Sequence, residues 1–490
     1  MGVAFVLLFR PGYVPELTAL MLGVIVVVAV ERRPELALCA LIVFMPFHQA
    51  ILASLYRIGL PAGLVRPMSQ WKEALILGLV VVGARKAARE QHRLDRLDWL
   101  AMAYVGLGTL YVLVPGLFVG EAVGAQIPLD TRGQGFRTDV LYVALFLAAR
   151  HLRLSPQARR SVTRAFLVTA TVVCALALIE YVFQDFWNTL WLEWVRVAHY
   201  RLEVLRSIDP NLGSVQVRTD VAGRELLRAG SVLFLPFALG CYGAVACAVF
   251  AQRIGSGTAR RAEHVGLLVA GTAVLLTITR SAIFGLAIVV LLSLFRRPGV
   301  SDPTVRAARV RFALLITAVL LVAVPVAASL GVIDRFTGRD DYSSNEEHRE
   351  GVERGYRMLI DHPLGRGLAT GAGPGQANAV STVAITESQY LQVGTQLGIL
   401  GLGLWVLVAV HVVLALRRAA RRGPPGEDHR LLEGCWIALV GLLAAGAFLQ
   451  IFTEFSLSWS LWILAGVALG SNEAERLAVA RHDEPAYSRQ

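Results

Sequence analysis

Residues Ala165–Phe183 read AFLVTATVVCALALIEYVF, a run of 19 residues in which Glu180 carries the only charge. A helix needs roughly 20 apolar residues to cross the hydrocarbon layer of a membrane, so this run is nearly long enough to span it. Inside lipid each backbone N–H and C=O group must be paired within its own segment, which favours a helix. Further apolar runs lie at Leu17–Val30, Ala74–Val82, Val232–Phe250 and Leu314–Leu330.

The composition agrees with a membrane protein. The 490 residues are 55% hydrophobic and only 17% charged, whereas soluble domains carry roughly a quarter charged residues. We predict an all-α, polytopic integral membrane protein with about 12 to 14 transmembrane helices, in which residues 1–490 form a single membrane domain. The expected spans are 14–30, 36–56, 70–84, 98–119, 138–149, 162–183, 228–251, 263–278, 281–296, 311–330, 389–415, 432–450 and 459–470.

The net charge of +11 follows the predicted topology. Five short loops together hold 23 Lys and Arg residues against 6 acids, and such loops stay on the cytoplasmic side of a membrane. The loops that alternate with them hold 13 Arg against 17 acids. The charge therefore predicts topology, and we expect no nucleic-acid partner. The basic loops are 85–96, 150–164, 252–264, 296–311 and 416–430, and the others are 120–137, 184–227 and 331–388.

No cofactor or metal is predicted. The five cysteines lie in or beside apolar runs, without CxxC spacing or a histidine cluster, so we expect reduced packing residues. Asp340-Asp341 is the nearest approach to an acidic metal-binding pair, but adjacent residues do not share a helix face, and a solvated loop is the favoured interpretation.

The predicted outer loop 331–388 carries a helical pattern from Glu346 to Ile360, which Pro363 should end. Five glycines follow within Gly365–Gly375. They allow either a flexible linker or a backbone that approaches an anionic ligand closely. The predicted outer loop 184–227 places Trp187, Trp191 and Trp194 at the spacing of one helix face. This pattern favours an amphipathic helix at the membrane interface, with a sugar-stacking platform as the alternative.

Arg280 is the most informative single residue. It lies between two apolar spans, at the outer face according to the loop alternation, and an arginine that faced lipid there would cost several kcal/mol. It either caps a tight turn between helices or extends to the lipid headgroups, or it projects into an outer cavity and binds an anion. Glu387 also has two interpretations. It is either a functional acid at the end of the outer loop or an acid at a helix N-terminus, where the helix dipole favours a negative charge.

Several short motifs of this sequence occur in the same order as the motifs of one known family. Residues 279–282, Thr-Arg-Ser-Ala, resemble a Ser-Arg-Gly-Ala turn, and residues 349–367 resemble a loop with an arginine, a helix and His-Pro-Leu-x-Gly-x-Gly. Residues 387–391 and 398–401 resemble a His-Asn-x-Tyr-Leu segment and its trailing Gly-x-x-Gly, and residues 228–231 occupy the place of an arginine before a span. Together they resemble the bacterial O-antigen ligase and O-antigen polymerase superfamily, membrane glycosyltransferases of the C-type fold.

The resemblance implies a function. Members act on glycans carried by undecaprenyl diphosphate, at the periplasmic face of the bacterial inner membrane. Glu387-Ser388 stands where ligases carry His-Asn, which favours a polymerase of surface polysaccharide over a ligase that transfers the glycan to lipid A core. The implied partners are the lipid-linked donor, a lipid-linked glycan or lipid A core as acceptor, membrane lipids and other polysaccharide assembly proteins. A polyprenyl-lipid flippase or transporter and a non-catalytic scaffold are the rival classes.

The resemblance also implies roles for residues. Arginine can stabilise a departing diphosphate without a metal, because its planar fork matches phosphate oxygens. Arg280 and Arg228 are the expected catalytic arginines, and Glu387 is the expected base. The expected substrate-binding residues are Arg224, Arg349, His362, Arg366, Gln389 and Tyr390.

Overall fold

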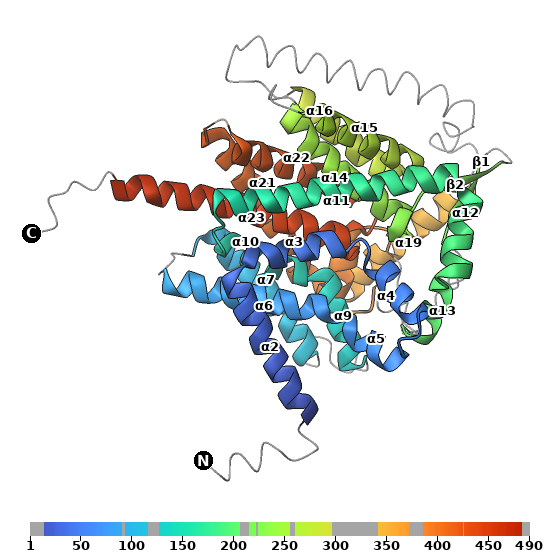
Figure 1. Ribbon diagram of the computed structural model, residues 1–490, viewed down its shortest axis with the longest axis horizontal. Coiled ribbons are helices and arrows are strands. Elements are labelled where there is room, and N and C mark those ends of the chain that lie inside the picture. Colours follow the sequence, from blue (N-terminus) through green and yellow to red (C-terminus); the bar gives the residue numbers. More distant parts are fainter. Residues whose placement is uncertain are drawn as a thin grey trace, which may run out of the picture.

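The computed structural model describes residues 14–90, 94–115, 127–205, 215–221, 224–254, 260–295, 342–371, 386–424 and 426–482. These residues form a bundle of helices, and one two-stranded sheet is present among them (Figure 1). The all-α fold is therefore confirmed.

The elements of the first half of the chain are helical throughout the described residues. Their bounds are α2 Val14–Arg32, α3 Pro34–Phe44, α4 His48–Arg57, α5 Ala62–Met68, α6 Trp71–Arg89, α7 Arg96–Leu113, α9 Leu129–Asp139, α10 Leu141–His151, α11 Pro156–Val182, α12 Gln184–Asn188, the π-helix η3 Thr189–Trp194 and α13 Val197–Glu203.

The second half contains the sheet. Its elements are β1 Val217–Val221, β2 Arg224–Arg228, the 3-10 turn η4 Ser231–Leu233, α14 Pro236–Ile254, α15 Arg261–Leu276, α16 Arg280–Phe295, α19 Tyr342–Asp361, α21 Gln389–Arg422, α22 Glu427–Ala445, the 3-10 turn η5 Ile451–Thr453 and α23 Phe455–His482. Strands β1 and β2 pair antiparallel, with Val217 opposite Arg228.

Several helices are long and apolar enough to cross a membrane. They are α11, α14 and α21, with the bent pair α3–α4 as a fourth, and shorter apolar helices lie at Leu141–His151, Arg280–Phe295 and Phe455–Gly470. The chain is thus a multi-pass membrane protein. The expected span 311–330 lies outside the described residues, and the total of about 12 to 14 spans stays a prediction.

Helix α14 lies at the centre of the bundle, packed against α11, α15, α16 and α22. Close approach depends on small residues. A Cβ on Gly243 would lie 2.7 Å from the Val274 side chain in α15, and a Cβ on Gly434 in α22 would lie 2.9 Å from Cα of Val249. Because lipid offers no hydrophobic drive between helices, tight van der Waals packing at such positions holds them together.

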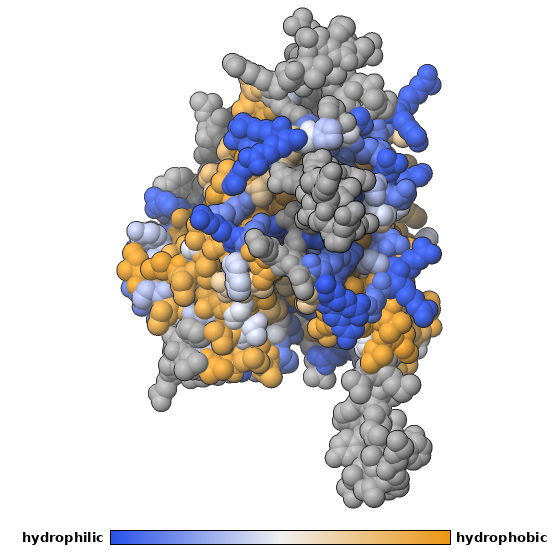
Figure 2. Space-filling model, turned by 90° about the vertical axis from the view of Figure 1, so that its left-hand side faces the viewer, coloured by the Kyte–Doolittle hydropathy of each residue, from blue (hydrophilic) through white to orange (hydrophobic). Residues whose placement is uncertain are grey.

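Ion pairs join the predicted basic loops at one end of the bundle. Arg150 contacts Asp95 at 2.7 Å, which links loops 150–164 and 85–96. Arg159 Nε donates to Asp428 at 2.9 Å, and Arg253 lies 3.9 Å from Glu427, which connects loops 416–430 and 252–264 to the same cluster. Figure 2 views the molecule from the side of this end, and hydrophilic residues gather there beside hydrophobic flanks. We call this end the basic face.

The ion pair with Arg150 changes the pKa of the Asp95 carboxyl. Burial alone would raise the pKa of its carboxyl, but the hydrogen bond and charge of Arg150 outweigh burial and lower the pKa to about 2. A carboxyl with a lowered folded-state pKa stabilises the fold above its ordinary pKa, and this contribution disappears as the pH falls through about 2. The pair therefore stays intact across the physiological range.

Two expected spans differ from the observed helices. Residues 36–56 form two helices, α3 and α4, that meet at 75°. Pro46 lies in the break, where a proline removes a backbone donor and clashes with the preceding turn. The expected span 228–251 begins only at Pro236, because Arg224–Arg228 pairs with β1 and the 3-10 turn follows.

The prediction that three tryptophans share one helix face is wrong. Trp187 and Trp191 are buried, whereas Trp194 is 57% exposed. The π-helix explains the difference: the Val195 N–H donates to the Leu190 carbonyl five residues back, at 2.9 Å. Such wider turns rotate Trp194 out of register with the first two rings.

Helix α21 is broken at Gly398, whose φ of 71° and ψ of −174° are essentially restricted to glycine. The loop after α19 fills the break. Arg366 N–H donates to the Thr395 carbonyl at 2.8 Å, Gly367 N–H to the Gln396 carbonyl at 3.0 Å, and Ile399 N–H to the Pro363 carbonyl at 2.8 Å. The His-Pro-Leu-Gly-Arg-Gly segment thus supplies the partners that the broken helix lacks.

We expect Gly398→Ala to destabilise the protein. Its Cβ would lie 2.4 Å from the Pro363 carbonyl oxygen, and the backbone conformation alone costs an alanine about 1–3 kcal/mol. The midpoint of thermal unfolding in detergent should fall. Gly403→Ala is the matched control in the same helix, because nothing lies within 4 Å of a Cβ there. Equal midpoints for the two variants would contradict this explanation of the break.

Candidate functional site

The end of the bundle opposite the basic face carries most of the predicted site residues. Helix α11 runs across the molecule, and β1, β2, α12, α13 and α19 lie toward the end at which it terminates (Figure 1). We call this end the outer face. It is where α15 turns into α16 and where α21 begins.

Arg228 is bound to the turn between α15 and α16. Its Nε donates to the Thr277 carbonyl at 3.1 Å, and its Nη2 donates to Thr279 Oγ1 at 3.0 Å. The neighbouring Ala229 N–H donates to the Leu276 carbonyl at 3.0 Å. Thr279 directly precedes Arg280, so the structure brings both predicted catalytic arginines to the same turn.

The turn presents Arg280 at the first residue of α16. Ile278 adopts a left-handed φ of 48°, and Thr277 Oγ1 donates to the Val274 carbonyl at 2.7 Å. Gly240 in α14 lets the helices approach, because a Cβ there would lie 2.6 Å from Cβ of Ala282. A helix N-terminus offers free N–H groups and a positive dipole end, so this turn can bind an anion together with the guanidinium.

Glu180 fixes the chain just after Arg228. Its carboxylate, fully buried, accepts hydrogen bonds from the N–H groups of Gly230 at 3.0 Å and Ser231 at 2.6 Å. Ser231 has a left-handed φ of 54°, and its hydroxyl donates to the Val173 carbonyl at 2.7 Å. In the sequence Glu180 stands out only as a charge inside a predicted span. An acid in an apolar run indicates a buried partner, but that partner, Gly230, lies fifty residues further along the chain.

Glu387 lies at the start of α21 and faces α19. Its φ is 51°, and its Oε2 lies 3.4 Å from Nδ1 of His348. The Glu387 side chain is 33% exposed, so solvent and ligands can reach it. His348 is not among the predicted site residues, because its contact with Glu387 joins residues that are 39 positions apart in the sequence. The pair places a carboxylate and an imidazole together at the outer face.

The N-terminal ends of α16 and α21 both contact residues that follow α22. Gln389 N–H donates to the Gly446 carbonyl just after α22, at 2.8 Å. Phe284, one turn into α16, packs edge-on against Phe448 with ring centroids 5.8 Å apart. Arg280 and Glu387 therefore both lie at the C-terminal end of α22.

Gln389 and Tyr390 contact protein in this structure. Gln389 is fully buried, and its side-chain oxygen accepts from Phe452 N–H at 2.8 Å. Tyr390 donates its hydroxyl to the Leu443 carbonyl at 2.9 Å and packs edge-on against Trp405. The Gln389 side-chain oxygen and the Tyr390 hydroxyl thus tie α21 to η5 and α22, and the buried Gln389 amide nitrogen has no hydrogen-bond partner among the described residues.

The other predicted binding residues are spread over the outer face. Arg349 is exposed on α19 and pairs with Glu346 at 2.6 Å. His362 is exposed, and its carbonyl accepts from Gly365 N–H at 2.8 Å. Arg366 is partly buried beside Met358, and burial lowers the pKa of its guanidinium. Arg224 begins β2, opposite Val221, and Asp340-Asp341 lies outside the described residues.

No group of three or more His, Cys, Asp or Glu side chains with metal-binding geometry occurs in the part of the chain that the structure describes. The structure has all five cysteines as free thiols, with Cys174, Cys241, Cys247 and Cys435 buried in the bundle and Cys39 half-buried.

Comparison with known proteins supports one family. The model of the family described as O-antigen ligase matches residues 265–406. This region covers α15, α16, α19 and the first part of α21, and so it includes Arg280, His348 and Glu387 but not Arg228. No curated protein matches the chain.

We expect Glu180→Ala to loosen the turn after Arg228. Two buried N–H groups would lose their acceptor, at about 1–3 kcal/mol each. Glu180→Gln keeps one oxygen acceptor and should lose less. Thermal unfolding of the purified variants provides the measurement, with exposed Glu193→Ala as the control. A Glu180→Ala midpoint equal to that of the control would show that the carboxylate does not hold this turn.

Proposed function

We propose that the chain is a member of the O-antigen ligase and O-antigen polymerase superfamily, since the O-antigen ligase model matches residues 265–406, and that it polymerises oligosaccharides carried on undecaprenyl diphosphate. The observation that carries the proposal is the binding of Arg228 to Thr277 and Thr279, which gathers two arginines at one turn of the outer face. We further propose that this face is the periplasmic face of a bacterial inner membrane, since the basic face lies opposite.

The arginines suit the leaving group. Glycosyl transfer breaks the bond between the anomeric carbon and the diphosphate, so negative charge develops on the diphosphate oxygens. Arg280 and Arg228 offer planar forks of N–H donors that match the geometry of phosphate oxygens. Arg228 already uses Nε and Nη2 on the turn, which holds its guanidinium in place before substrate arrives. Preorganised donors of this kind stabilise a transition state by several kcal/mol.

Glu387 suits the acceptor. The attacking sugar hydroxyl must lose a proton as it bonds to the anomeric carbon, and a carboxylate within reach can accept it. His348, 3.4 Å away, orients the carboxylate and can receive the proton in turn. This pairing supports Glu387 as the base in place of the histidine that ligases carry at the same motif.

The ligase activity is the second candidate, because the matching family model is described as O-antigen ligase. A ligase transfers the glycan once to an acceptor such as lipid A core, whereas a polymerase extends a lipid-linked chain. Purified protein with lipid-linked oligosaccharide alone distinguishes them: a ladder of longer lipid-linked products supports the polymerase, and transfer only after lipid A core is added supports the ligase.

We expect Arg280→Ala to reduce transfer by about 10²–10³-fold, the usual loss when one preorganised donor is removed. Arg280→Lys keeps the charge but not the fork, so it should recover only part of the rate. The rate of product formation from the lipid-linked oligosaccharide measures both. Near-normal rates for both variants, with expression intact, would refute the assignment of Arg280.

We expect Glu387→Gln to abolish transfer and His348→Gln to lower the rate and change its dependence on pH, because the imidazole lies 3.4 Å from the proposed base. Glu353→Gln is the control: this exposed acid lies on the same helix as His348 and pairs with Arg357. A pH profile unaltered by His348→Gln would mean that the histidine serves only the fold.

A further inference from the structure

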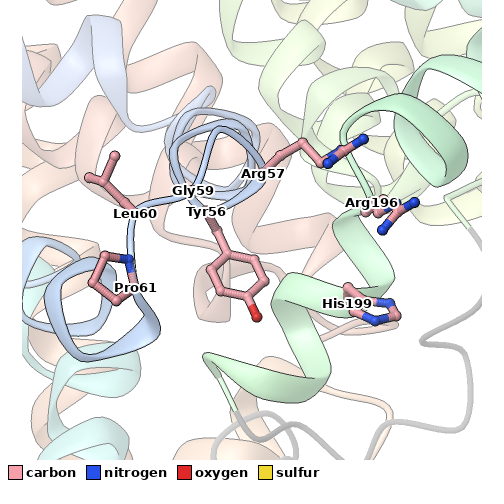
Figure 3. A pocket seen from close by; sticks show the side chains of 7 residues that line it. All are labelled: Tyr56, Arg57, Gly59, Leu60, Pro61, Arg196 and His199. Atoms are coloured by element: carbon pink, nitrogen blue, oxygen red, sulfur yellow. The ribbon is translucent and has the colours of Figure 1, made fainter.

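A cationic cavity lies on the outer face, apart from the turn that carries Arg228 and Arg280. Its volume is about 330 Å³, and its walls come from the turn between α4 and α5 and from the junction of η3 with α13 (Figure 3). It is lined by Tyr56, Arg57, Gly59, Leu60, Pro61, Arg196 and His199. None of these residues belongs to the proposed catalytic site.

Arg57 is held across the cavity. Its Nε donates to the Trp194 carbonyl at 2.9 Å, which joins α4 to the end of the π-helix. Figure 3 shows its side chain reaching toward Arg196. A guanidinium has five N–H donors, and this bond uses one, so four remain for a ligand.

Arg196 is held in an unusual backbone conformation. Its φ of 55° and ψ of 49° are left-handed, which costs a residue with a side chain about 1–2 kcal/mol. The residue follows a π-helix, and both features are frequent at functional sites. Among the described residues, no carboxylate lies within ion-pair distance of its guanidinium.

The cavity has an excess of positive charge. The Glu203 carboxylate lies beside the cavity, where it accepts a hydrogen bond from the Tyr56 hydroxyl and lies 3.6 Å from His199 Nε2. Arg57 and Arg196 bring two positive charges to the cavity against this one negative charge, so the balance is positive. Two guanidinium forks from separate elements match the oxygens of a phosphate group better than a single carboxylate.

Apolar side chains beside the cavity indicate where such a phosphate comes from. Ile58 is 73% exposed, Leu64 57% and Trp194 57%, and Phe186 packs edge-on against Trp194. Exposed aromatic rings of this kind lie at headgroup level in membranes. A soluble phosphate would gain nothing from these side chains, whereas lipid chains would cover them.

We propose that this cavity binds the phosphate group of an anionic lipid from the membrane leaflet at the outer face. Arg57 and Arg196 contact the phosphate, and the apolar side chains beside the cavity contact the acyl chains. The inference stands independently of glycosyl transfer, because it rests on other residues.

Binding of phosphatidylglycerol to the purified full-length protein, followed by native mass spectrometry, tests the proposal. Phosphatidylcholine serves as the zwitterionic comparison and inorganic diphosphate as the soluble one. We expect Arg57→Gln and Arg196→Gly each to weaken phosphatidylglycerol binding at least 10-fold. Arg196→Gly should leave thermal stability equal or higher, because glycine adopts a positive φ without strain. Arg357→Gln removes an exposed cation outside the cavity and should change nothing.

Two results would overturn the proposal. Equal phosphatidylglycerol binding by the wild type, Arg57→Gln and Arg196→Gly would show that the cavity is not the site. Inorganic diphosphate that binds as tightly as the lipid would show that the ligand is a soluble anion. A loss of glycosyl transfer in Arg280→Ala with lipid binding intact would support the cavity as a separate site.

Discussion

The outer face depends on how the backbone groups of a broken helix are paired. Helix α21 breaks at Gly398, which frees carbonyls that a continuous helix would use, and an unpaired backbone group in an apolar bundle costs several kcal/mol. In the segment after α19, the N–H groups of Arg366 and Gly367 donate to the freed carbonyls of Thr395 and Gln396. This exchange fixes α19 against α21 and so brings His348 to Glu387. The glycines after α19 and the glycine in α21 therefore stabilise the same contact between the two segments.

Much of this architecture could be predicted from local rules. The apolar runs correspond to helices, the helix expected from Glu346 to Ile360 is observed as Tyr342–Asp361, and it ends just before Pro363 as expected. Arg280 also lies at a turn between two helices. These features follow from lipid burial, from helix periodicity and from the steric effect of proline, each of which acts within a few residues.

The remaining features depend on partners distant in the sequence. Glu180 acts through N–H groups fifty residues later, and His348 meets Glu387 across a loop. The π-helix that turns Trp194 away from Trp191 has no sequence pattern of its own. Strand β2 pairs with β1 over residues that local polarity assigned to a loop and the start of a span. Local physical rules singled out Arg280 and the resemblance added Arg228, but neither predicted the contacts that hold them.

The central claim is that Arg228 and Arg280 bind the diphosphate of a lipid-linked glycan. Electron cryomicroscopy of the protein in lipid nanodiscs with undecaprenyl diphosphate tests it most directly. The account predicts phosphate density within hydrogen-bond distance of both guanidinium groups, at the N-terminus of α16. Diphosphate density elsewhere, such as in the cavity of Arg57 and Arg196, with none at the α15–α16 turn, would contradict it.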